Sequence, residues 1–142
     1  MAELDALIRV RKHVVEQKQK FLAELYRQGE ELENQKQTML KQMEEEMETV
    51  KDLDVQMLSY FGPYTDAVKD RVAEIDQARE TLDKRIEIAR EDMREAFAEL
   101  KKVEITQERR EAEEEKEQNK KESDELDEVG LDAYRRGQKE EA

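Results

Sequence analysis

The sequence predicts an all-α protein, a long antiparallel two-helix coiled-coil hairpin with a short, partly flexible C-terminal tail. Of its 142 residues, 46% are charged and only 5% are aromatic, a composition typical of long helices and coiled coils. Apolar residues recur at alternating steps of three and four, which is the coiled-coil repeat. This periodicity favours a coiled coil over disorder, the other class that high net charge and modest hydrophobicity indicate.

The first predicted helix covers residues 3–60. Its apolar seam runs from Leu4 to Phe61, and four residues interrupt it: Arg11, Lys18, Gly29 and Lys36. No alternating period-two pattern competes with this spacing, so no strand is expected here.

A turn is predicted at residues 61–66, which contain the only proline of the chain. Pro63 lacks a backbone N–H and its ring clashes with the preceding helical turn. Gly62 suits the left-handed conformation that closes a helix. Thr65 or Asp66 can cap the helix that follows.

The second predicted helix covers residues 66–125, and its seam steps regularly from Val68 to Val103. From 104 to 124 only Ile105 and Ala112 are apolar, so this part can be helical without packing on another element. We expect a hairpin domain over 1–125. In the tail, residues 126–142, Gly130 and Gly137 predict a short or interrupted helix, with disorder at the terminus.

The predicted turn leaves one end of the hairpin without a partner. Residues that face each other across it have numbers adding to about 126, so Val14 falls near Ala112 and Ile8 near Gln118. The first helix then keeps an uncovered apolar stripe, called here the N-terminal stripe: Leu4, Leu7, Ile8, Val14, Val15, Phe21 and Leu22. Such a stripe is typical of a partner site.

The charges around the N-terminal stripe differ from those of the whole chain. Residues 1–20 hold five Lys and Arg against three acidic residues, whereas the chain has a net charge of −13. An apolar stripe with a basic rim suits a partner groove, or more weakly an anionic membrane surface. In the alternative, the tail folds back and covers the stripe with Leu126, Val129 and Leu131.

A second candidate surface is the aromatic cluster Tyr60, Phe61 and Tyr64 at the predicted turn. Rigid aromatic side chains are good contact points because they lose little rotamer entropy on binding. Alternatively, they only staple the turn to the two helices.

The sequence gives no sign of catalysis, and we expect a non-enzyme without cofactor or metal. Cysteine is absent and the single histidine, His13, has no second ligand beside it. The strongly negative charge argues against nucleic acid. We find neither a signal peptide nor an apolar run of the roughly 20 residues that a membrane span needs, and we expect a cytosolic protein.

Three stretches resemble one protein family. They are Tyr60–Tyr64, the segment 82–104 with its most specific block Ala96–Glu104, and Leu126–Leu131. Together they are similar to FliJ, the soluble stalk component of the flagellar type III export apparatus, in the form found in alphaproteobacteria. One departure is the charge, because members of this family are often more basic.

The resemblance implies a cytoplasmic stalk, peripheral to the flagellar basal body and monomeric when free. Its implied partners are the export ATPase hexamer, the cytoplasmic part of the export-gate membrane protein, and export chaperones. The open end would enter the ATPase ring through Leu7, Ile8, Arg11, Val14 and Val15. The region from Tyr60 to Arg79, including Phe61, Tyr64 and Arg71, would face the gate. Two alternatives remain, a dimeric structural spacer and a holdase-type chaperone.

Overall fold

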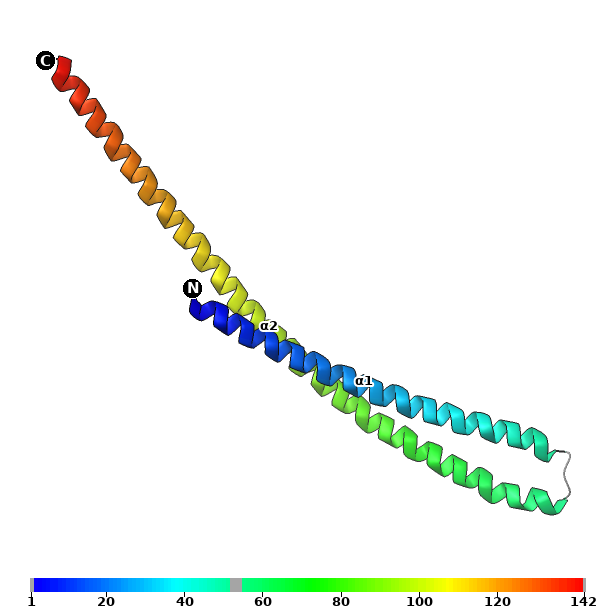
Figure 1. Cartoon of the computed structure of the whole chain (residues 1–142). Coiled ribbons are helices and arrows are strands. Elements are labelled where there is room, and N and C mark those ends of the chain that lie inside the picture. Colours follow the sequence, from blue (N-terminus) through cyan, green and yellow to red (C-terminus); the bar gives the residue numbers. More distant parts are fainter. Residues whose placement is uncertain (1, 52–54, 142) are drawn as a thin grey trace. The chain divides into compact units, whose positions relative to one another are not determined.

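Two long helices make up the structure, a computed structural model that describes residues 2–51 and 55–141. Helix α1 is Ala2–Val50 and helix α2 is Val55–Glu141, with 49 and 87 residues (Figure 1). Every described residue except Lys51 lies in one of them. The predicted all-α hairpin is confirmed.

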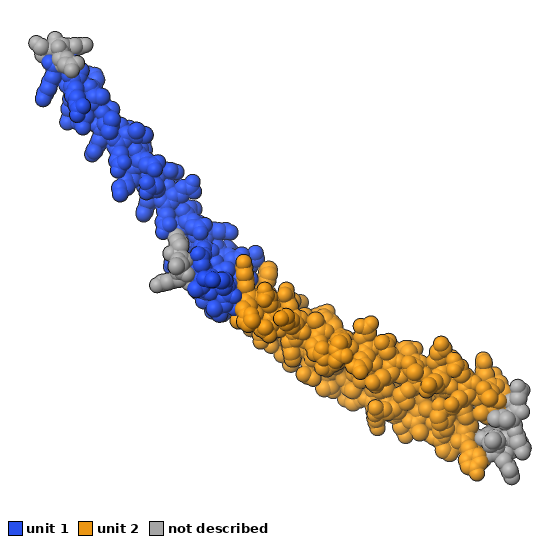
Figure 2. Space-filling view, in the orientation of Figure 1, with its two compact units in different colours: residues 1–11, 98–142 blue, residues 12–97 orange. Residues whose placement is uncertain are grey.

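The chain divides into two compact units, shown in Figure 2. Unit 2 is residues 12–97 and holds most of α1 with the first half of α2. Unit 1 is residues 1–11 and 98–142, which pair the start of α1 with the second half of α2.

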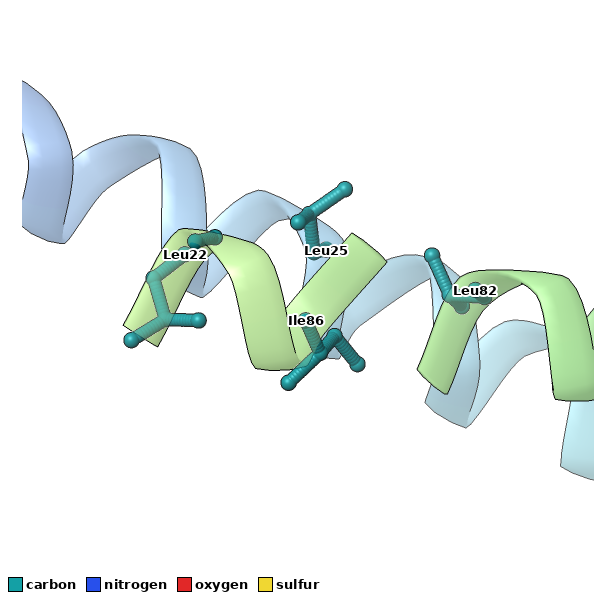
Figure 3. Close-up of a cluster of buried hydrophobic side chains, with 5 residues drawn as sticks. Leu22, Leu25, Leu82 and Ile86 are labelled. Carbon is teal, nitrogen blue, oxygen red and sulfur yellow. The ribbon is translucent and has the colours of Figure 1, made fainter. Parts of the chain in front are cut away.

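The two helices of unit 2 are antiparallel and pack through a narrow apolar core. Five buried side chains form its centre: Leu22, Leu25, Leu82, Ile86 and Ala89. Figure 3 shows the side chains of both helices meeting there. Leu25 is only 1% exposed. Burying each Leu or Ile contributes about 1.5–3 kcal/mol, and Val15, Val68 and Ile75 of the same unit are buried as well.

Burial follows the predicted seven-residue repeat on both helices. On α1 the fully or half-buried positions include residues 8, 15, 22, 29, 36, 43 and 50, and also 4, 11, 18, 25, 32 and 39. On α2 they include 68, 75, 82, 89, 96 and 103, and also 72, 79, 86, 93, 100 and 107. Two positions in every seven are therefore covered, as expected of a coiled-coil seam.

The register of the hairpin differs from the prediction. Lys36 Nζ lies 2.8 Å from Asp76 Oδ1, and in unit 1 Gln107 donates to Asp5. In each pair the residue numbers add to 112, not to the predicted 126. The difference of 14 is two whole heptads, so the seam positions face each other in both registers.

The predicted end of the first helix and the predicted start of the second were also wrong. The chain reverses between Val50 and Val55, whereas residues 61–66, the predicted turn, are helical and Pro63 is the ninth residue of α2. An internal proline costs about 3 kcal/mol. The observed register offsets that cost by burying Ile8, Val15 and Leu22, each worth roughly 1.5–3 kcal/mol.

The second half of α2 continues beyond the stretch that packs on α1. Every residue from 108 to 139 is exposed. Gly130 and Gly137 lie inside the helix, and neither has another group near the position of an added Cβ. The tail is therefore part of α2 as far as Glu141, which differs from the short or interrupted helix that we expected.

Candidate partner-binding surfaces

Most of the predicted N-terminal stripe is buried or half-buried. Ile8 and Val15 are 9% and 6% exposed, Leu22 is also buried, and Leu4, Arg11 and Val14 are half-buried. The prediction failed because its register placed these seam residues opposite polar ones. In the observed register α2 covers Ile8, Val15 and Leu22, while Leu7 and Phe21 stay exposed.

A narrower apolar strip remains next to the seam on α1. Leu7, Val14 and Phe21 are one heptad apart, so they share one side of the helix. Leu7 and Phe21 are exposed, Phe21 to 50%. We call these three residues the flanking strip. The exposed Val10, which the sequence analysis did not single out, lies nearby on the same helix.

In unit 1 a shallow hollow lies beside the start of α1. It has a volume of about 200 Å³ and is lined by Leu4, Leu7, Lys102, Val103 and Thr106. The Nε of Arg11 is buried without a hydrogen-bond partner. Two predicted site residues, Leu4 and Leu7, thus line a small apolar depression rather than an open stripe.

The aromatic cluster lies on the first turns of α2, against the end of α1. Phe61 and Tyr64 have ring centroids 5.7 Å apart, and Tyr60 is 76% exposed. Together with Glu46, Thr49 and Val50, these three aromatic residues line a hollow of about 240 Å³. The staple interpretation therefore fits Phe61 and Tyr64, while Tyr60 is the aromatic side chain that a partner can reach.

The hydroxyl of Tyr64 interacts with α1. Its hydrogen bond to the carboxylate of Glu46 raises the pKa of Tyr64, and desolvation and the charge of Glu46 act in the same direction. This bond joins the two helices close to the reversal of the chain.

Two arginines were predicted to face a partner, and the structure shows that they differ in exposure. Arg71 is exposed, pairs with Glu74 at 2.9 Å, and lines a polar hollow of about 630 Å³ on α1 and α2. Arg79 is half-buried in the seam, where its Nη1 donates to the carbonyl of Gly29 at 2.7 Å. Its Nε also donates to Asp83. Arg79 therefore connects the two helices.

Sequence analysis missed the polar contacts between the helices. Besides Gly29–Arg79 and Lys36–Asp76, Arg90 Nε donates to the hydroxyl of Tyr26 at 2.7 Å and its guanidinium lies 5.6 Å from the ring centre. Gly29 and Lys36 stood out in the sequence as interruptions of the first seam, whereas their contacts on α2, Arg79 and Asp76, did not.

The tail residues of the candidate site are fully accessible. Leu126, Val129 and Leu131 are 54–70% exposed, and Tyr134 is exposed beside them. They do not cover the start of α1. The preceding stretch, 108–128, has eleven acidic and five basic residues, a net charge of −6. The tail thus presents separate apolar side chains next to a strongly acidic helix.

No arrangement for metal chemistry is present in the described residues, among which no three His, Asp or Glu side chains form a group that could hold an ion. Likewise, neither described helix contains a stretch long and apolar enough to cross a bilayer.

Comparison with known proteins gives one match. The family described as flagellar FliJ protein matches residues 1–139, nearly the whole chain. No curated protein and no solved structure matches it. This family is a non-catalytic component of flagellar protein export. The two-helix hairpin and the match along its length lead to one conclusion: the chain belongs to the FliJ family of flagellar proteins.

Proposed function

We propose that this protein is the stalk of the flagellar export ATPase, cytoplasmic and located at the basal body. It binds the ATPase hexamer and links it to the cytoplasmic part of the export gate. Family membership supports a role in the export apparatus. The observation that supports the stalk is the hairpin, whose two helices fill each other's seam and present outward-facing strips and shallow hollows.

The flanking strip is the proposed ATPase contact. Leu7 and Phe21 are exposed, and the first 20 residues hold five Lys and Arg against three acidic residues. The predicted contacts Ile8 and Val15 are buried, so they reach a partner only if the seam opens.

The test is ATP hydrolysis by the export ATPase with and without this chain. We expect faster hydrolysis, and its loss on Val14→Asp or Phe21→Asp, because a carboxylate in an apolar contact is left unpaired. Phe21→Asp is the cleaner variant because Phe21 is half-exposed. Gln17→Asp adds the same charge at an exposed position on α1 and should leave the stimulation intact. Equal stimulation by all four proteins would exclude this strip as the contact.

Tyr60 is the proposed contact with the export gate, because it is the most exposed member of the aromatic cluster. Binding of the purified cytoplasmic part of the gate protein should weaken on Tyr60→Ala. Asp66→Ala, at another exposed position of the same helix, is the control. Unchanged affinity in Tyr60→Ala would move the gate contact elsewhere.

The proposed resting state is a monomer, since α2 already fills the seam that a dimeric spacer would use. Light scattering across a dilution series tests this, and a dimer that persists at low concentration contradicts it.

The same ATPase assay separates the stalk from a holdase, which would suppress aggregation of denatured clients without changing hydrolysis. Escort of export chaperones is part of the proposal, with the exposed tail as its candidate surface.

A further inference from the structure

Tyr60 and Phe61 fall on the seams of different helices. Continued from Val50, the seam of α1 would reach Tyr60. Continued backwards from Val68, the seam of α2 reaches Thr65 and then Phe61. The structure uses the second pattern, since Phe61 and Thr65 are half-buried while Tyr60 is 76% exposed. This short stretch can therefore supply a seam residue to either helix.

Three residues just after this stretch fit a turn better than the helix that contains them. Pro63 has no N–H to donate within α2. Thr65 Oγ1 is buried without a hydrogen-bond partner, an arrangement that destabilises the helical state of this segment. Gly62 has open space around it. In a turn, Pro63 loses its clash and Thr65 can cap the next helix.

We propose that the hairpin has a second register, displaced by two heptads, in which α1 extends through Tyr60 and the chain reverses at 61–66. Facing residues would then have numbers adding to about 126 in place of 112. Because the displacement is a whole number of heptads, the two seams still face each other.

The apolar contacts favour the first register, because the second register would leave Ile8 and Val15 beside polar residues of α2, although it would bring Tyr60 into the seam. Against this, the second register takes Pro63 out of a helix interior and lets Thr65 cap the helix that follows. The polar contacts between helices favour the first register. Lys36, now 2.8 Å from Asp76, would face Arg90, and Arg79 would lose the carbonyl of Gly29. The second register is therefore the minor state of the two.

The second register would control the proposed ATPase contact. It uncovers Leu4 and Ile8, which join Leu7 in a wider apolar surface at the start of α1. This consequence rests on the proposed function. Cross-linking of the chain alone tests the second register, whereas the ATPase assay tests the proposed contact. Each idea can therefore fail without the other.

The absence of cysteine makes thiol cross-linking a direct test. Asp83→Cys is combined with a second cysteine at one of three positions on α1, each separated by one heptad. Glu33 and Asp83 lie one heptad along from the touching pair Tyr26 and Arg90, so Glu33→Cys reports the first register. Met47→Cys, two heptads further on, reports the second. Leu40→Cys, halfway between them, measures background.

With a short bifunctional maleimide, the 33/83 pair should give the main product. The 47/83 pair should give a minor product that exceeds the 40/83 background. Pro63→Ala should reduce the 47/83 product to background, because it removes the main reason for a turn there. Lys36→Glu should raise it about three- to tenfold, since it repels Asp76 in the first register and attracts Arg90 in the second. Lys41→Glu makes the same charge change at an exposed position and should have no effect.

A 47/83 product at background level in both the parent chain and Lys36→Glu would overturn the proposal. An undiminished 47/83 product in Pro63→Ala would also overturn it, because cross-linking would then not depend on the second turn.

Discussion

Individual seam residues differ in how much they contribute to stability, and Leu25 is among the most deeply buried of them. It is 1% exposed and contacts the central cluster on both helices. Leu25→Ala should lower the free energy of unfolding by about 2–5 kcal/mol, through lost burial and the cavity left behind. Urea denaturation followed by circular dichroism measures this. Leu126→Ala makes the same change at a 70% exposed position and should shift stability by less than about 0.5 kcal/mol. Similar losses in both variants would contradict the assigned core.

Tyr64 should titrate unusually late. Its bond to Glu46 favours the neutral hydroxyl and raises its pKa above the 10.0 of an unperturbed tyrosine. A raised pKa in the folded state stabilises the fold below the unfolded value, and this contribution is lost as the pH rises through the folded value. Tyrosinate absorbance measures the titration. Glu46→Gln should move the transition of Tyr64 to lower pH, and Tyr64→Phe should delete it. An identical titration curve for Glu46→Gln would show that the bond is not formed.

Gly29 and Arg79 together give the seam a defined register. A Cβ at residue 29 would lie 3.2 Å from Arg79 Cζ, so the glycine leaves room for the guanidinium that bonds its carbonyl. A polar group at one seam position commonly fixes register at some expense of stability. Gly29, which interrupts the predicted seam, and its partner Arg79 therefore distinguish one alignment from another.

At the scale of the helices, packing divides α2 into two parts with different stability. The part that faces α1 has buried seam residues, whereas every residue from 108 to 139 is exposed. An unpacked helix opens readily because little buried surface holds it. Hydrogen exchange measured by mass spectrometry should show fast exchange over 108–139 and the slowest exchange around residues 22–32 and 79–89. Equal protection along α2 would mean that 108–139 is covered by another surface.

The helices could be predicted from the sequence, but their alignment could not. The heptad repeat determines which face of each helix is buried, and burial of Ile8, Val15 and Val68 follows it. A repeat is unchanged by displacement through whole heptads, so the register depended on the turn alone. Pro63 was the strongest local signal for a turn, and the burial of Ile8, Val15 and Leu22 outweighed it. The same error affected the N-terminal stripe, because it was predicted to be open on the basis of the wrong register.

For the molecule as a whole, the net charge of −13 works against folding. Like charges along the helices repel each other, and salt screens exposed charges over roughly 10 Å at 0.1 M. The melting temperature should therefore rise between low salt and about 0.15 M salt. The ion pairs oppose this trend weakly, because exposed pairs such as Arg71–Glu74 contribute about 0–1 kcal/mol. A melting temperature that falls with added salt would show that ion pairs outweigh the repulsion.

The uncovered second half of α2 also bears on how this chain survives in a cell. Proteases cut where the backbone can unwind without disturbing a core, and residues 108–139 offer basic cleavage points at Arg109, Lys120 and Arg135. Digestion there would release an acidic fragment and leave the packed hairpin standing. The lifetime of the intact polypeptide should accordingly depend on whatever shields that stretch, with the trimmed hairpin accumulating wherever the shield is missing.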